Sequence, residues 1–472
     1  MTKVAEDFQS TLEEAFTHAL SHLKQLDTAP VAATAELDRL RSQLAKTLER
    51  KGIRPEQVVR ELVQDVSGGL LGSASGRFFG WVIGGTLPAA VGADWLTSIW
   101  QQNGAMYACS PAESVVEETV GTWLKEILNI PAAASFALVS GCQMAHVTCL
   151  AAARHSLLTK RGWDIEADGL FGAPRIRILS STERHGSIER AVRLLGLGRS
   201  AVEVLPIDEE GRLVPDRLEQ ALRAVPDAPT IVLLQAGDIN IGAYDCFADL
   251  IPIAKRFGAW VHVDGAFGLW AAASSQLKYL IKDVDQADSW ATDGHKWLNV
   301  PFDCGFAFVA DAEAHRGSLA IRASYLTHAT EARDQVEWNP EWSRRSRGFA
   351  AYATLRQLGR DGLEELIDRC CRHAKAIVNG IGELPGAEVL WEPVINQGLV
   401  RFPDPAAGAT EADHDRNTDR VIAEILKTGE AFFGGTTWRG QRAMRVSVCN
   451  WRTSEADVER VVNAVAKVLK KL

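Results

Sequence analysis

Seven short runs rich in β-branched and aromatic residues alternate with helix-like stretches between residues 136 and 310. The runs are FALVS, RIRILS, VEVLPI, TIVLLQA, WVHVDGA, DSWATD and GFAFVA. Alternation of this kind predicts a mostly parallel sheet with helices on its faces. The expected fold class is therefore α/β, with a mostly parallel seven-stranded sheet flanked by helices. In open sheets of this class, ligands gather at the carboxyl ends of the strands.

The chain is expected to divide into three parts. Residues 1–85 begin with apolar residues at helical spacing, which predicts amphipathic helices that pack against a second subunit. A glycine-rich stretch, SGGLLGSASGRFFGWVIGGTLPAA, follows, and its aromatic residues favour a docked segment over a free linker. Residues 86–345 carry the seven runs and form the large domain. Residues 346–472 show shorter strands and helices that indicate a small C-terminal α+β domain.

The composition argues against several classes of partner. The 472 residues carry a net charge of -9, without basic clusters interleaved with aromatics, so a nucleic acid partner is not expected. The sequence has no run of about 18 apolar residues, so a membrane span is not expected. The acidic N-terminal stretch lacks the apolar core of a secretory signal, which predicts a cytoplasmic protein. The eight cysteines show no metal-ligand spacing, and no metal site is expected.

Two chemically suggestive side chains follow two of the predicted strands. Asp264 ends WVHVD, and Lys296 follows DSWATDGH. A lysine amine and a carboxylate fit pyridoxal phosphate chemistry, in which the amine holds the aldehyde as an imine and the carboxylate keeps the pyridine nitrogen protonated. Each residue alone also has an ordinary explanation, as a turn residue or a surface charge. Lys296, however, lies between His295 and Trp297, which prefer burial, and a buried amine is costly unless it is bonded or neutralised.

The segment HVDGAFG followed by DGHKWLNVPFDCG resembles the pyridoxal-phosphate-dependent amino acid decarboxylase family, which includes the aromatic amino acid and glutamate decarboxylases. The resemblance extends from about Phe78 to the C-terminus. It implies the aspartate aminotransferase fold, that is, a fold type I transferase-like architecture. It also implies pyridoxal 5'-phosphate as cofactor, an amino acid as substrate, and a homodimer with active sites near the interface. The implied activity is decarboxylation of an L-amino acid.

The segment SGCQMAHVTCLAAARHSLL places a turn before a helix whose N-terminal amides attract a phosphate. By spacing alone this is an ordinary strand-turn-helix connection. It resembles the phosphate cup of the family, which implies Gly141, Cys142 and Gln143 as phosphate contacts. Cys142 and Gln143 replace a small residue and a hydroxyl residue, so the backbone amides are expected to make these contacts.

Three further predictions concern residues around the ring of the cofactor. His185 precedes a helix, where a solvated histidine is ordinary, and the resemblance implies that its imidazole stacks on the ring and helps hold the substrate. In QAGDINIGAYD, Asp238 replaces a hydroxyl residue that approaches the cofactor in the family, and Asp245 is expected to cap the next helix. His262 shares a strand face with Asp264 and either orients that carboxylate or is a core histidine.

Arg445 lies in the apolar strand AMRVSVCN, where an isolated guanidinium is costly to bury. It therefore requires an anion, either a local Asp or Glu or the carboxylate of a substrate, and the resemblance favours the substrate.

Decarboxylases of the family usually protonate the product with a tyrosine on a mobile loop. The corresponding stretch here contains only Tyr325, which fits a structural position better, so His328, Lys296 or water is considered instead. Another pyridoxal enzyme that cleaves Cα bonds, such as a carbon-carbon lyase or an oxidative deaminase, and a catalytically silent cofactor-binding protein remain alternatives.

The expected site therefore comprises catalytic residues Lys296, His185 and Asp264, with Arg445 binding the substrate. The expected cofactor contacts, all near the ends of predicted strands, are Gly141, Cys142, Gln143, His185, Asp264, Ala266, Ser289, His295 and Lys296.

Overall fold

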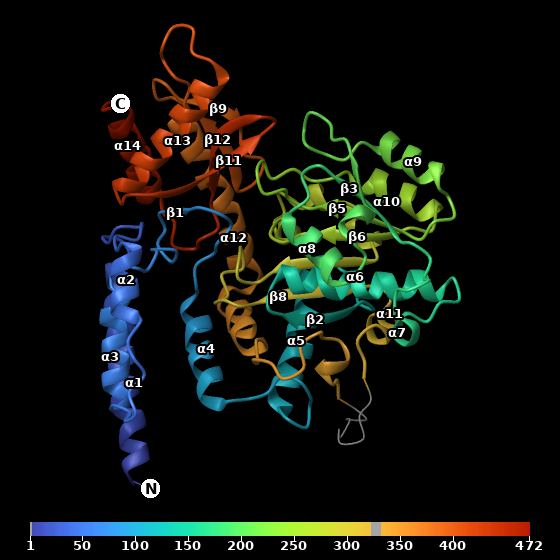
Figure 1. Cartoon of the computed structure of the whole chain (residues 1–472), viewed down its shortest axis with the longest axis horizontal. Coiled ribbons are helices and arrows are strands. Elements are labelled where there is room, and N and C mark those ends of the chain that lie inside the picture. The colour runs from blue at the N-terminus through green and yellow to red at the C-terminus, as the bar shows by residue number, and fades with distance from the viewer. Residues whose placement is uncertain (1, 322–331) are drawn as a thin grey trace.

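The seven runs form one seven-stranded sheet in the computed structural model, which describes residues 2–321 and 332–472 (Figure 1). The strand order is β2-β8-β7-β6-β5-β3-β4. Neighbours from β7 to β4 run parallel, and β8 runs antiparallel to both β7 and β2. The prediction of a mostly parallel sheet is confirmed, and the carboxyl ends of β2, β3, β5, β6 and β7 lie at one edge. The strands span β2 (Ser135–Val139), β3 (Arg177–Ser181), β4 (Val202–Leu205), β5 (Thr230–Gln235), β6 (Trp260–Asp264), β7 (Ser289–Asp293) and β8 (Gly305–Val309).

Both faces of this sheet are buried, because alternate strand residues enter two separate apolar cores. Along β5, Ile231 and Leu233 enter the core beneath α6 and α8, whereas Val232 and Leu234 enter the larger core with α5, α9, α10 and α12. The same alternation in β6 turns Trp260 toward the α6 face. The helices around the sheet span α4 (Pro88–Trp100), α5 (Pro111–Ile127), α6 (Cys142–Thr159), α7 (Ile165–Asp168), α8 (Gly186–Leu194), α9 (Pro215–Ala224), α10 (Phe247–Arg256) and α11 (Ala312–Gly317). Short 3-10 helices span Arg199–Ala201, Gly268–Ala273, Lys278–Ile281, Val284–Gln286 and Gln335–Glu337.

A second, five-stranded sheet lies in the C-terminal part of the chain, in the order β1-β11-β12-β10-β9. Its first strand comes from the glycine-rich segment, since Phe78 and Phe79 pair in parallel with Phe432 and Phe433. The docked position of this segment is thus confirmed. The long helix α12 contacts both α5 of the large domain and β10 of the small sheet. The elements span β1 (Phe78–Phe79), β9 (Glu388–Trp391), β10 (Gln397–Arg401), β11 (Phe432–Trp438), β12 (Gln441–Ser447), α12 (Gly348–Gly382), α13 (Glu411–Lys427) and α14 (Glu455–Leu469).

Three N-terminal helices, α1 (Thr2–Gln25), α2 (Leu37–Leu44) and α3 (Pro55–Asp65), stand beside the rest of the chain in Figure 1. Helices α1 and α3 contact each other. Their apolar side chains are nevertheless largely exposed, and Phe8 and Leu62 expose 60% and 54% of their surfaces. The predicted amphipathic helices are therefore present, with an apolar face that this chain alone does not cover. None of the helices described here is both long enough and apolar enough to cross a bilayer.

The glycine-rich segment also passes directly over the turn that carries Lys296. A Cβ atom at Gly84 would lie 1.8 Å from the carbonyl oxygen of Lys296. The next residue, Gly85, donates its amide to Asn299 Oδ1 at 2.6 Å. Glycine is required at position 84 because any side chain would push this turn away.

We predict that Gly84→Ala lowers the free energy of unfolding by about 3 kcal/mol, since the added methyl overpacks against backbone atoms. The matched control is Gly92→Ala in α4, where a Cβ meets nothing within 4 Å. That control is expected to raise the same free energy by about 0.5–1 kcal/mol, because alanine favours helices. Urea unfolding measures both changes, and equal stability of the two variants would contradict the prediction.

Candidate active site

Parallel pairing of β6 with β7 brings Asp264 and Lys296 to the same edge of the sheet. Lys296 Nζ lies 2.9 Å from Asp293 Oδ2, and Asp293 Oδ1 accepts a hydrogen bond of 2.6 Å from the Cys142 amide. The sulfur of Cys142 then lies 4.0 Å from Asp264 Oδ1. Asp293 and Cys142 therefore link the lysine to the Asp264 carboxylate, and both groups lie at the same edge of the sheet, as expected from the sequence.

Asp293 is the residue that the sequence analysis missed. It ends β7 three residues before Lys296, and its side chain is 3% exposed. Burial alone would lower the pKa of Lys296, but the charges of Asp293 and Asp264 outweigh it and raise that pKa. The amine, on a side chain that is 20% exposed, is therefore held as an ammonium ion. The available signal was the spacing of an acid three residues before the lysine.

The start of α6 forms a tight cradle at this edge. A Cβ atom at Gly141 would lie 2.9 Å from His295 Cε1, so only glycine fits there. The Cys142 amide, which was expected to face a phosphate, donates to Asp293 instead. Gln143 uses its side-chain amide to donate to the Ser187 carbonyl at 3.2 Å. Phosphate binding by the rest of this helix start stays a prediction.

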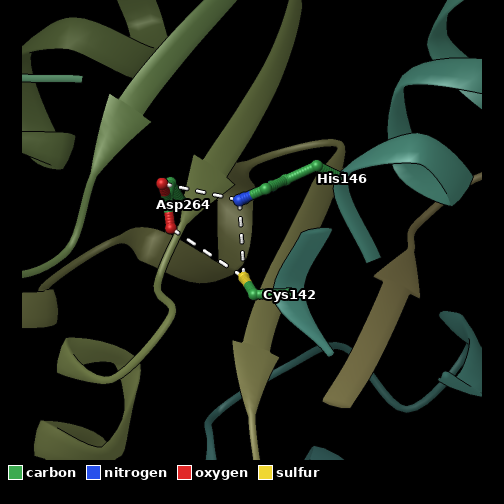
Figure 2. Close-up of side chains that lie close together, drawn as sticks. All are labelled: Cys142, His146 and Asp264. Carbon is green, nitrogen blue, oxygen red and sulfur yellow. Dashed lines mark hydrogen bonds and ion pairs between the residues drawn. The ribbon is translucent and has the colours of Figure 1, made fainter. Parts of the chain in front are cut away.

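Asp264 is nearly enclosed, and its two oxygens have different neighbours. Oδ1 accepts a hydrogen bond of 3.2 Å from the Ala266 amide. Oδ2 lies 3.5 Å from His146 Nε2, as Figure 2 shows. His146 also lies 3.4 Å from the Cys142 sulfur. His146 was not predicted from the sequence, because it lies inside an apolar helix, where a histidine is usually a packing residue.

His262 reaches Asp264 through His146 rather than directly. Its Nε2 lies 3.0 Å from His146 Nδ1, and its Nδ1 lies 2.9 Å from the Ser289 hydroxyl. Ser289 is fully buried behind this pair and also accepts from Trp260 Nε1. Ser289 is thus linked to Asp264 through two histidines, and its role as a neighbour of the cofactor stays a prediction.

Two other histidines flank the site from neighbouring loops. His185 is the N-cap of α8, where its Nδ1 accepts from the Ser187 amide. Packing around its ring lowers the pKa of His185, against the opposing effect of Asp264. His295 accepts from the Cys304 amide through Nδ1, and its Nε2 lies 3.5 Å from Asp293 Oδ1.

Arg445 lies on β12 and is 6% exposed. Its Nη1 donates to the Ile239 carbonyl at 2.8 Å, and burial lowers its pKa to about 10. Within residues 2–321 and 332–472, no carboxylate lies within ion-pair distance of this guanidinium. The ion pair considered from the sequence is therefore absent from this part of the chain. The guanidinium retains donors for an external anion.

In the loop after β5, the carboxylate of Asp238 accepts from the amides of Asn240, Ile241 and Ala243, so it holds its own loop together. The sequence prediction for Asp245 is wrong. Asp245 does not cap α10, because its oxygens accept from the Leu213 and Gln235 amides at 2.7 and 2.8 Å. Tyr325 and His328 lie outside the described residues.

These donor groups fit pyridoxal 5'-phosphate. Lys296 offers a primary amine at one end, Asp264 offers a carboxylate oxygen at the other, and Gly141 leaves a cradle that a Cβ would fill. Arg445 adds a cation that has no carboxylate partner among the described residues.

Comparison with known proteins gives consistent matches. A family model described as "Pyridoxal-dependent decarboxylase conserved domain" matches residues 38–403. Tryptophan decarboxylase 1 of Oryza sativa subsp. japonica is 27% identical, over 94% of this chain and 90% of that protein. The 4-hydroxyphenylacetaldehyde synthase of Rhodiola rosea is 26% identical, over 88% and 85%. The crystal structure of Oryza sativa TDC with PLP and tryptamine superposes with a TM-score of 0.92 at 25% identity, covering 99% of this chain and 98% of that one.

We predict that Asp293→Asn lowers the pKa of Lys296, because the substitution removes the nearest negative charge without changing shape. The reactive neutral amine then forms at lower pH. The midpoint of the pH profile for borohydride-trapped addition of pyridoxal to Lys296 should therefore move to lower pH. Asp283→Asn serves as control, since that acid lies outside this network. A midpoint that stays in place or rises in Asp293→Asn would contradict the role of Asp293.

Proposed function

Since the chain belongs to the pyridoxal-dependent decarboxylase family, we propose that it removes carbon dioxide from an L-amino acid. The observation that carries this proposal is the link from Lys296 through Asp293 and Cys142 to Asp264. It supports one cofactor held between an amine and a carboxylate. A cytoplasmic location remains part of the proposal.

The cofactor, when bound, supplies an aldehyde for a primary amine and a cationic ring that accepts electrons from a Cα bond of the substrate. Lys296 would hold the aldehyde, and Asp293 would stabilise the positive charge on its nitrogen. Asp264 would keep a proton on the ring nitrogen, since its carboxylate points into an enclosed site. His185, at the start of α8, lies within the electrostatic influence of Asp264, Lys296 and Asp293.

Arg445 would orient the substrate by binding a carboxylate. A buried guanidinium without an anionic partner is costly, and a substrate carboxylate removes that cost by a charge-assisted pair. The pocket then selects the reaction by fixing which Cα bond stands perpendicular to the ring.

The direct test is product analysis with purified holoenzyme. A panel of L-amino acids should include tryptophan, histidine and 2,4-diaminobutyrate, which appear in the names of relatives. Carbon dioxide and the corresponding amine should form in equal amounts. Because one relative is an aldehyde synthase, aldehyde and peroxide are measured in parallel. Aldehyde and peroxide in place of amine would refute simple decarboxylation.

We expect Lys296→Ala to abolish the visible absorbance band of the cofactor and the release of carbon dioxide, because no other amine lies at this position. Lys255→Ala is a suitable control, since Lys255 pairs with Asp288 on an exposed site. A band retained in Lys296→Ala would refute the assignment of the anchoring amine.

Arg445→Met should raise KM by about 10- to 100-fold, because a hydrogen-bonded charge pair is worth about 1.5–3 kcal/mol. Arg445→Lys should recover part of the loss, since a cation remains. Steady-state kinetics of carbon dioxide release distinguish the two variants. An unchanged KM in Arg445→Met would remove the residue from substrate binding.

We also propose that the chain forms a homodimer through its N-terminal helices. The exposed apolar stripe of α1 supports this, and it comprises Phe8, Leu12, Phe16, Leu20 and Leu23. A second copy offers the same stripe, which a twofold interface can bury.

The double variant Leu12→Lys/Leu20→Lys should weaken the dimer, because it buries two charges in that interface. Thr17→Lys adds a charge at an exposed polar position of α1 outside the stripe and serves as control. Sedimentation equilibrium measures the association constant. A monomeric parent protein would contradict the proposal.

A further inference from the structure

The face of β6 that is covered by α6 carries a row of polar groups leading to Asp264. Trp260, His262 and Asp264 share this face because side chains alternate along a strand. Ser289 joins the row from β7, and His146 joins it from the second turn of α6. The side chains of both histidines and of Ser289 are fully buried. Side chains buried between a strand and a helix are usually apolar, so this row of polar groups requires an explanation.

Consecutive members of the row lie close together. Trp260 Nε1 lies 2.9 Å from the Ser289 hydroxyl, which lies 2.9 Å from His262 Nδ1. His262 Nε2 lies 3.0 Å from His146 Nδ1. His146 Nε2 then lies 3.5 Å from Asp264 Oδ2 (Figure 2). Each nitrogen of both imidazole rings therefore faces one neighbour in the row.

The protonation of the two rings follows from their burial. Desolvation lowers the pKa of His146 and of His262 to about 3. Both rings are therefore neutral at neutral pH, and each carries one proton. Besides the Asp264 carboxylate at 3.5 Å, the residues Asp293, His185 and Lys296 also act electrostatically on His146, and their effects are smaller than that of burial. The remaining question is which nitrogen of each ring holds the proton.

The carboxylate end of the row decides that choice, because the Ser289 oxygen has two lone pairs and can accept from Trp260 whichever way the histidines point. Trp260 can only donate, and the carboxylate of Asp264 can only accept. A proton on His146 Nε2 faces the carboxylate and leaves Nδ1 to accept from His262 Nε2. His262 Nδ1 then accepts from the Ser289 hydroxyl. The opposite direction would leave a bare Nε2 beside the carboxylate. The Cys142 thiol, 3.4 Å away, could donate to that nitrogen, but Asp264 Oδ2 would then have no donor among the described residues, which costs free energy.

We propose that Trp260, Ser289, His262 and His146 form a one-directional hydrogen-bond relay that positions Asp264 and presents a proton to its carboxylate. His146 is thus a positioning residue that acts on the cofactor through Asp264. The relay stabilises the anionic form of Asp264 without adding a positive charge, so the carboxylate keeps its full attraction for a protonated ring nitrogen. The effect on the cofactor rests on the proposed function, whereas the direction of the relay does not.

Cys142, His146 and Asp264 also have the atom types of a zinc site, and these atoms lie within 4.8 Å of one another. Burial raises the pKa of the Cys142 thiol well above its usual value, which disfavours the thiolate that zinc requires. A zinc ion would also occupy the carboxylate that the cofactor needs. The observations therefore favour hydrogen bonds.

The direction of the relay is tested by nitrogen NMR of the full-length protein labelled with 15N-histidine, before and after removal of the cofactor. Signals are assigned with His146→Gln and His262→Gln. The proposal expects a proton on Nε2 and a bare Nδ1 in both rings at neutral pH. A proton on Nδ1 of either ring, or a charged imidazolium, would overturn it. Stoichiometric binding of added Zn²⁺ that His146→Gln abolishes would also overturn it.

A variant at the far end separates a relay from simple packing. Ser289→Ala removes the hydroxyl that donates to His262 Nδ1, so the 15N shift of that bare nitrogen should change, whereas both protons should stay on Nε2 because the Asp264 end of the row is intact. His146→Leu should lower kcat by about 10- to 100-fold with little change in KM. A loss of activity of this size is typical when a residue is removed that positions a functional side chain without touching the reacting atoms. His146→Gln should restore part of kcat, since its amide can donate toward Asp264.

These outcomes distinguish the inference from the proposed function. Expected tautomers without release of carbon dioxide would refute decarboxylation alone. Release of carbon dioxide with unchanged 15N shifts in Ser289→Ala, or with unchanged kcat in His146→Leu, would refute the relay alone.

Discussion

The carboxylate of Asp293 is the contact on which the rest of the site depends. It accepts from the Cys142 amide at the start of α6 and pairs with the Lys296 ammonium. Charges buried this deeply are stable only when they are paired and hydrogen-bonded, and Asp293 has both kinds of partner. Removing Asp293 would leave the Lys296 ammonium without its nearest anion and the Cys142 amide, at the start of α6, without its acceptor. Three features together therefore set the position of the Lys296 amine. They are the Asp293 carboxylate, the N-terminus of α6 and the close approach of the backbone at Gly84.

Helix α6 connects the two halves of the site. Its first residue, Cys142, bonds toward Asp293 by its amide and approaches Asp264 with its sulfur, and His146 one turn later lies beside Asp264. Residues four apart share a helix face, so this spacing places both side chains over the end of β6. The same helix covers the apolar core on that side of the sheet. Packing and chemistry are thus fixed by one element.

Much of this arrangement followed from the sequence. The seven runs predicted the sheet because their spacing and composition reflect strands buried on both faces, and the strand-end rule then placed Asp264 and Lys296 together. The spacing of Asp293 three residues before Lys296 was visible in the sequence, but its contact with the start of α6 and the contact of His146 with Asp264 join distant segments, which sequence patterns do not show. The wrong expectation for Asp245 has the same origin. An acid before a helix is an ordinary cap, but here the amides of Leu213 and Gln235 donate to the Asp245 carboxylate in place of the helix amides.

The central claim is that Asp264 holds the cofactor's ring nitrogen in its protonated state while Lys296 anchors the aldehyde. Nitrogen NMR of the holoenzyme with 15N-labelled cofactor measures that protonation state directly. The account predicts a protonated ring nitrogen in the parent protein and a deprotonated one in Asp264→Ala with cofactor still bound. A ring nitrogen that is unprotonated in the parent, or that stays protonated in Asp264→Ala, would contradict it.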